Sequence, residues 1–200
     1  MTTEMLPTTG QSANGAVEPG AGATLVDMAT WFEVQRFFTE EARLLDHRAF
    51  EEWLTLFTED VRYWVPARKV RMISSRRGDR EIDLELSADG EPCILDERLP
   101  QLRLRVFRMQ TGRLLWSENP PGRVRHLITN VEASYTDNPD ELSVRSNFLV
   151  PHARFDEKGP QYHGERQDIL RRVDGSLRIA SRKVVLDSTV IWSAAVTAFF

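Results

Sequence analysis

The sequence is poor in cysteine: Cys93 is the single thiol among 200 residues. One thiol cannot form an internal disulfide, and this scarcity is typical of proteins from a reducing compartment. It also excludes an iron–sulfur cluster or a cysteine-rich zinc site held wholly by this chain. Cys93 lies between Pro92 and Ile94, an apolar setting in which cysteines are usually inert. We therefore do not assign it as a nucleophile.

The sequence also lacks an excess of basic charge and any long apolar run. Lys and Arg number 26 against 30 Asp and Glu, a net charge of -4, so no surplus of cations is available for phosphates. No apolar stretch approaches the roughly 20 residues that span a bilayer. Residues 1–23 are small and polar, without the basic and apolar pattern of a signal peptide. We therefore expect a cytoplasmic protein with neither nucleic-acid nor membrane partners.

Motifs that bind cofactors or metals are missing as well. The sequence has no glycine-rich phosphate loop, dinucleotide fingerprint, His-Glu-x-x-His or nucleophile elbow. A mononuclear iron site takes two histidines and a carboxylate on one face. The spacing of the four histidines places no two of them together on one element: His47, His126, His152 and His163. We therefore expect no metal or cofactor site in this chain.

What is present predicts one α+β domain after a disordered tail. Residues 1–25 are rich in Gly, Ala, Thr, Pro and Ser and bury too little apolar area to fold, whereas residues 26–200 suit a single domain. Apolar spacing predicts helices near 26–45, 48–57 and 94–109, a strand at 61–65, an irregular segment at 68–90, and strands at 124–135, 142–155, 162–173 and 177–192. Helices followed by a meander favour a cone-shaped curved antiparallel sheet wrapped around the N-terminal helices.

Two functional interpretations follow from such a cone. Its interior can host acid–base catalysis, and Asp46, Tyr63 and His126 have suitable side chains. The same residues equally suit a helix terminus, core packing and an interface hydrogen bond. In this interpretation the protein is a free-standing isomerase or dehydratase; a binding module with the same fold and no chemistry is a third option.

Arginine and tryptophan favour an interaction surface instead. Arginines outnumber lysines on the predicted strands, where they alternate with acidic residues: Arg123, Arg125, Arg166, Arg171, Arg172, Arg178 and Arg182, with Glu165, Asp168 and Asp187. A solvated face explains this pattern, but arginine is also enriched at protein interfaces because its planar group makes bidentate contacts. Trp64 and Trp116 lie beside polar neighbours, as interface anchors do.

Several strings resemble the β (small) subunit of aromatic-ring-hydroxylating, Rieske-type dioxygenases, in its biphenyl and benzene branch. They are residues 116–131 (WSENPPGRVRHLITNV), 50–54 with 60–66 (FEEWL and DVRYWVP), 164–172 (GERQDILRR) and the final Phe199-Phe200. Their order and spacing agree with the family from Val34 onward. Gly122 departs from the family pattern, which has serine there, and so does the segment that begins at Leu186.

The resemblance implies a cone fold like those of ketosteroid isomerase and scytalone dehydratase, and an α3β3 hexamer. It places the Rieske [2Fe-2S] cluster and the mononuclear Fe(II) in the α subunit, with electrons from NADH through a reductase and a ferredoxin. The complex would convert an aromatic hydrocarbon to a cis-dihydrodiol. This chain would support assembly without catalytic, cofactor or metal residues. We expect subunit contacts at Trp64, Trp116, Arg123, Arg125 and His126.

Overall fold

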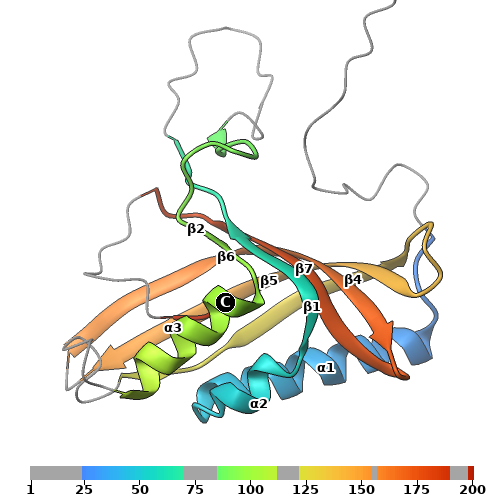
Figure 1. The fold of residues 1–200 in the computed structure, drawn as a ribbon, viewed down its shortest axis with the longest axis horizontal. Coiled ribbons are helices and arrows are strands. Elements are labelled where there is room, and N and C mark those ends of the chain that lie inside the picture. Colours follow the sequence, from blue (N-terminus) through green and yellow to red (C-terminus); the bar gives the residue numbers. More distant parts are fainter. Residues whose placement is uncertain (1–23, 70–84, 112–121, 155–156, 190–197) are drawn as a thin grey trace, which may run out of the picture.

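The computed structural model describes residues 24–69, 85–111, 122–154, 157–189 and 198–200 (Figure 1). Side chains of residues 154–160 are outside this description. Within it, three helices lie on one side of a curled seven-stranded sheet (Figure 1). The α+β cone expected from the sequence is therefore confirmed. None of the helices in the described ranges is long and apolar enough to cross a membrane.

The long helix α1 (Met28–Asp46) begins at Asp27, whose side chain accepts a hydrogen bond from the Thr30 amide at 2.9 Å. Such caps satisfy amides that have no partner within the helix. Val34, Phe38 and Leu45 are buried on one face of α1, as the predicted apolar spacing requires. The short helix α2 (Phe50–Leu54) follows and buries Trp53 completely.

The sheet has the strand order β2-β1-β7-β6-β5-β3, and β4 pairs with β5. Its strands are β1 (Phe57–Val65), β2 (Leu95–Glu97), β3 (Arg123–Val124), β4 (Leu127–Tyr135), β5 (Glu141–Arg154), β6 (Glu157–Val173) and β7 (Ser176–Leu186). The long strands β4 to β7 form an antiparallel meander, as predicted. A tight turn at Asp174-Gly175 joins β6 to β7, with both residues at positive φ, as hairpin turns require.

The expectation of a wholly antiparallel sheet needs one correction. Strand β1 pairs with β7 in parallel, with Tyr63 opposite Arg182. Hairpin connections fix the relative direction of the later strands, but β1 and β7 are separated by most of the chain. No local turn signal therefore specifies their direction.

The boundaries of two predicted helices also differ. Helix α3 covers Leu99–Thr111 rather than starting at residue 94, because Leu95–Glu97 forms strand β2 against β1. Pro100 stands in the first turn of α3, where its missing amide costs nothing. Helix α2 ends early because Phe57 already pairs with Ile179 of β7. Leu25, placed in the predicted tail, forms a β-bridge with Ser134; residues 1–23 lie outside the described ranges.

Candidate functional site

A cluster of charged side chains lies inside the cone, where helix α1 faces strands β6 and β7. Arg182 is fully buried and donates to both oxygens of Asp168, at 2.8 and 2.9 Å, and to both oxygens of Glu41, at 2.5 and 3.0 Å. Arg166 donates to Glu41 at 3.1 Å, and the Trp53 indole adds a bond at 3.2 Å. Two carboxylates therefore balance two guanidinium groups.

The neighbouring charges determine the ionisation states of Glu41 and Arg182 in this cluster. Burial by itself would raise the pKa of Glu41, but Arg182 and Arg166 outweigh it and hold that pKa at about 2. Burial likewise opposes the charge on Arg182, yet Asp168 and Glu41 keep its pKa well above the ordinary value. Glu41 and Arg182 are therefore ionised in the folded protein. Charges buried in this way persist only when they are paired and hydrogen-bonded.

The placement of these arginines corrects the interpretation of them as a surface set. Arg166, Asp168 and Arg182 are at most 2% exposed. The sequence does contain this signal, because alternate residues of a strand face the same side. Arg166 and Asp168 therefore lie on the same face as buried Leu170, and Arg182 lies on the same face as Val184. Glu41 has helical spacing to buried Phe38 and Leu45, so it lies on the buried face of α1 despite its charge.

Phe199 and Phe200, the last two residues of the sequence, fill the space beside this cluster. Their side chains are 2% and 1% exposed. The Phe199 ring packs on Trp53, with centroids 4.3 Å apart, and the Phe200 ring lies 5.2 Å from that of Tyr162. Aromatic pairs at such distances are favourable beyond their buried area. The sequence singled out this pair only through the family resemblance.

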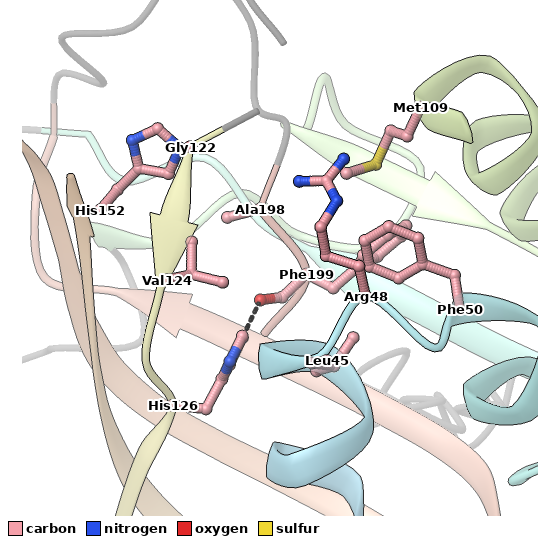
Figure 2. Close-up of a pocket in the computed structure, with 10 residues that line it drawn as sticks. All are labelled: Leu45, Arg48, Phe50, Met109, Gly122, Val124, His126, His152, Ala198 and Phe199. Atoms are coloured by element: carbon pink, nitrogen blue, oxygen red, sulfur yellow. Dashed lines mark hydrogen bonds between the residues drawn. The ribbon is translucent and has the colours of Figure 1, made fainter. Parts of the chain in front are cut away.

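The three acid–base candidates lie around the same two residues. His126 Nδ1 is 2.8 Å from Asp46 Oδ1, and Nε2 is 3.0 Å from the Phe199 carbonyl oxygen (Figure 2). Because a carbonyl oxygen only accepts, Nε2 donates in this contact. The Tyr63 hydroxyl donates to the Phe200 oxygen at 3.0 Å and accepts from the Phe200 amide at 2.9 Å. Burial raises the pKa of Tyr63, so its hydroxyl keeps its proton.

These contacts leave little room for a substrate. The cavity beside His126 has a volume of about 20 Å³, which suits one water molecule. Figure 2 shows Leu45, Val124, Phe199 and Arg48 among the residues that line it. A larger hollow of about 560 Å³ lies between α2, β1 and α3, but none of the three acid–base candidates lines it. Asp46 and His126 form a pair of a kind used for proton transfer. The second ring nitrogen of His126, Nε2, is already hydrogen-bonded to the Phe199 oxygen.

Gly122 lies at the edge of the small cavity, directly against His152 (Figure 2). A Cβ atom at residue 122 would be 2.1 Å from His152 Nε2, far inside van der Waals contact. The serine that the resemblance predicts at this position would require the His152 ring to move. The His152 ring takes the space that a side chain at residue 122 needs.

The residues predicted to contact other subunits differ in accessibility. Arg123 and Arg125 are exposed, and the Arg125 side chain is 70% exposed although it lies 3.8 Å from Asp46. Trp64 is half-buried on β1, and the cations of Arg62 and Lys183 both lie over its ring. The His126 side chain is only 3% exposed. Trp116 lies outside the described residues.

Among the described residues, no group of three His, Cys, Asp or Glu side chains is arranged to hold a metal ion. His126 and His152 both line the small cavity. Within the described ranges, Asp46 is the one carboxylate hydrogen-bonded to His126. This part of the chain therefore offers a hydrogen-bonded pair rather than a coordination site.

Comparison with known proteins identifies the family. Residues 40–193 match the family model of the ring hydroxylating beta subunit. The beta subunit of biphenyl 2,3-dioxygenase from Rhodococcus jostii (strain RHA1) is 35% identical over 177 residues, 88% of this chain and 91% of the relative.

Solved structures agree with the sequence comparison. A chain of naphthalene 1,2-dioxygenase, solved with indole in its active site, superposes with a TM-score of 0.73 at 27% identity and covers 88% of both chains. A protein described as a scytalone dehydratase from Novosphingobium aromaticivorans (DSM 12444) gives 0.53 at 16% identity, over 84% of this chain and 92% of the other, and so shares the fold alone. With the match over residues 40–193, these findings show that the chain belongs to the family of ring-hydroxylating dioxygenase beta subunits.

Proposed function

We propose that this chain is the non-catalytic subunit of a dioxygenase complex and that it holds α subunits in an α3β3 assembly. The α subunit would carry the Rieske cluster and the mononuclear iron, and a reductase and ferredoxin would deliver electrons to it. The reaction would add both atoms of O₂ to an aromatic ring and give a cis-dihydrodiol. The biphenyl dioxygenase relative suggests a hydrophobic aromatic substrate.

One observation supports a structural role more than any other: the chain fills its own cone. The Phe199 and Phe200 rings are buried, their main-chain oxygens accept bonds from the acid–base candidates, and about 20 Å³ remains beside His126. A catalytic pocket for a small organic substrate has a volume of a few hundred Å³. The free-standing isomerase or dehydratase is therefore the less favoured function.

We place the contacts with other subunits on two exposed arginines, Arg123 and Arg125, which follow Gly122 in the sequence. Arg123 and Arg125 expose planar groups suited to bidentate bonds with carboxylates. Trp64 offers a half-buried ring on β1. The buried ring of His126 would not touch the partner itself. It would orient the Asp46 carboxylate, which lies 3.8 Å from Arg125. Trp116 remains part of this predicted contact set.

Purification of the chain with and without its partner tests the proposed function. Purified alone, it should bind no stoichiometric iron and should not turn over aromatic substrates or cyclic ketones. Added to separately expressed α subunit, it should restore dihydrodiol formation and a stable hetero-oligomer. Turnover by the isolated chain that is lost in Asp46→Asn would contradict the proposal and favour the acid–base enzyme.

A further inference from the structure

The last three residues of the sequence are held differently from an ordinary core segment. Residues 198–200 belong to no helix or strand, yet Ala198, Phe199 and Phe200 are all buried. Buried main-chain groups need partners, and core segments usually find them in neighbouring backbone. Here three side chains supply them: His126 to the Phe199 oxygen, and Tyr63 with Arg182 to the Phe200 oxygen.

These donors come from separate parts of the fold and are held by other groups. His126, between β3 and β4, is oriented by Asp46 of α1 at 2.8 Å. Arg182 of β7 donates to the Phe200 oxygen at 2.8 Å while Asp168 and Glu41 fix its other nitrogens. A few polar groups that converge from several elements in apolar surroundings are also the make-up of a ligand site.

The two rings occupy two aromatic subsites. The Phe199 ring lies 4.3 Å from Trp53 and 5.6 Å from Phe50, and the Arg105 guanidinium covers it at 4.2 Å. The Phe200 ring lies between Phe148 and Tyr162, with centroids 5.5 and 5.2 Å away. Each subsite therefore combines an aromatic wall with a hydrogen-bond donor for the carbonyl oxygen of the same residue.

We propose that the cone interior is a binding site for aromatic peptide segments, and that Ala198–Phe200 occupies it as an internal ligand. Its two subsites each take one aromatic side chain together with one main-chain carbonyl oxygen. Ala198 and Phe199 also line the small cavity, which has room for about one water molecule beside the bound segment (Figure 2). A peptide of the same chemistry binds in trans once the internal rings are removed.

The test uses the full chain with the double substitution Phe199→Ala and Phe200→Ala, and the tripeptide alanyl-phenylalanyl-phenylalanine as probe. Calorimetry should show one tripeptide bound per chain, with a rise in Tm of at least about 3 °C at saturation. The tripeptide alanyl-leucyl-leucine should bind at least tenfold more weakly, because it keeps the main-chain oxygens of both positions but lacks the rings. The wild-type chain, whose tethered segment competes at high effective concentration, should not bind either peptide detectably.

A matched control removes two rings from outside the cone. Phe32→Ala with Phe107→Ala changes side chains that are 57% and 58% exposed and should create no peptide site. Absence of binding to a folded Phe199→Ala/Phe200→Ala chain, or equal binding to that chain and the wild type, would overturn the proposal. If the double variant does not fold alone, recovery of its thermal transition on refolding with the tripeptide supports the site, and failure to recover contradicts it.

Discussion

At the scale of single residues, the cone interior holds a cluster of buried charged side chains. Glu41 accepts bonds from Arg182, Arg166 and Trp53 and is 1% exposed. Removing one member of a buried ion cluster leaves the others unpaired in a medium of low dielectric constant. Glu41 therefore connects helix α1 to the sheet electrostatically as well as by packing.

Replacing Glu41 by glutamine should lower the free energy of unfolding by about 3–5 kcal/mol, because Arg182 and Arg166 then share a single carboxylate. Urea denaturation of the isolated chain measures this change. Glu40→Gln is the matched control, since Glu40 pairs with Arg43 on the surface and should change stability by less than about 1 kcal/mol. Equal effects of the two substitutions would contradict the assigned role of Glu41.

The low pKa of Glu41 also predicts sensitivity to acid. Its folded value of about 2 lies below the ordinary 4.5, so between these values the unfolded chain binds more protons. The contribution of Glu41 is thus complete above about pH 4.5 and is lost as the pH falls toward 2. Unfolding free energies measured at pH 5 and pH 3 should differ more in the wild type than in Glu41→Gln. The same difference in both proteins would exclude Glu41 as its source.

Gly122→Ser should destabilise this chain by about 1 kcal/mol, the low end of the range for an overpacked site, because a side chain can turn aside to admit the new atoms. The new Cβ would collide with the His152 ring, which must move away. His152→Ala should remove most of that cost, so the double-mutant cycle should give a coupling energy of at least about 0.5 kcal/mol. Purely additive effects in chemical denaturation would show that the two residues do not compete for space.

At the scale of elements, alternation along the strands decides what faces the cone. Leu142, Val144, Phe148 and Val150 of β5 are all buried, as the period of two predicts. The same period places Arg166 and Asp168 inside the cone with Leu170. Their charge suggested a solvated face. They are buried instead, because Glu41 and Arg182 provide ionic partners inside the cone.

Local periodicity was sufficient for the long helices and strands and for the core face of β5. It missed strand β2, which lies inside the predicted helix at 94–109, and the burial of Glu41 on α1 and Arg182 on β7. It could not show the parallel pairing of Tyr63 with Arg182, which lie more than a hundred residues apart and share no turn. The sequence indicated Asp46, Tyr63 and His126 from their chemistry. It did not show that Phe199 and Phe200 lie among them, because contacts so distant along the chain leave no pattern in spacing.

Strands β6 and β7 approach each other closely at Gly164, and a substitution there tests how much this approach matters. A Cβ atom there would lie 2.0 Å from the Val185 carbonyl oxygen, and backbone cannot turn aside as a side chain can. Gly164→Ala should therefore cost at least about 2 kcal/mol of unfolding free energy. His163→Ala, at the half-exposed neighbouring position, should cost less than about 1 kcal/mol in the same denaturation experiment. A Gly164→Ala chain as stable as the wild type would show that the strands separate easily.

At the scale of the whole molecule, the proposed structural role depends on contacts between this chain and the α subunit. Arg125→Glu should weaken binding to the α subunit at least tenfold, because reversing a charge at an interface opposes a complementary partner. The new carboxylate would also lie near Asp46, so thermal denaturation of the isolated chain must accompany the binding measurement. Arg43→Glu on α1 reverses an exposed charge elsewhere and should leave binding unchanged. An undiminished hexamer with Arg125→Glu would exclude this residue from the contact.

The most direct test of the structural-subunit account is native mass spectrometry of this chain, tagged and co-expressed with its α subunit, with iron counted on the same sample. The account predicts equal copies of the two chains in a hexamer, with all the iron lost when the α subunit is omitted. An iron-free oligomer of this chain alone, formed even in the presence of the α subunit, would contradict it.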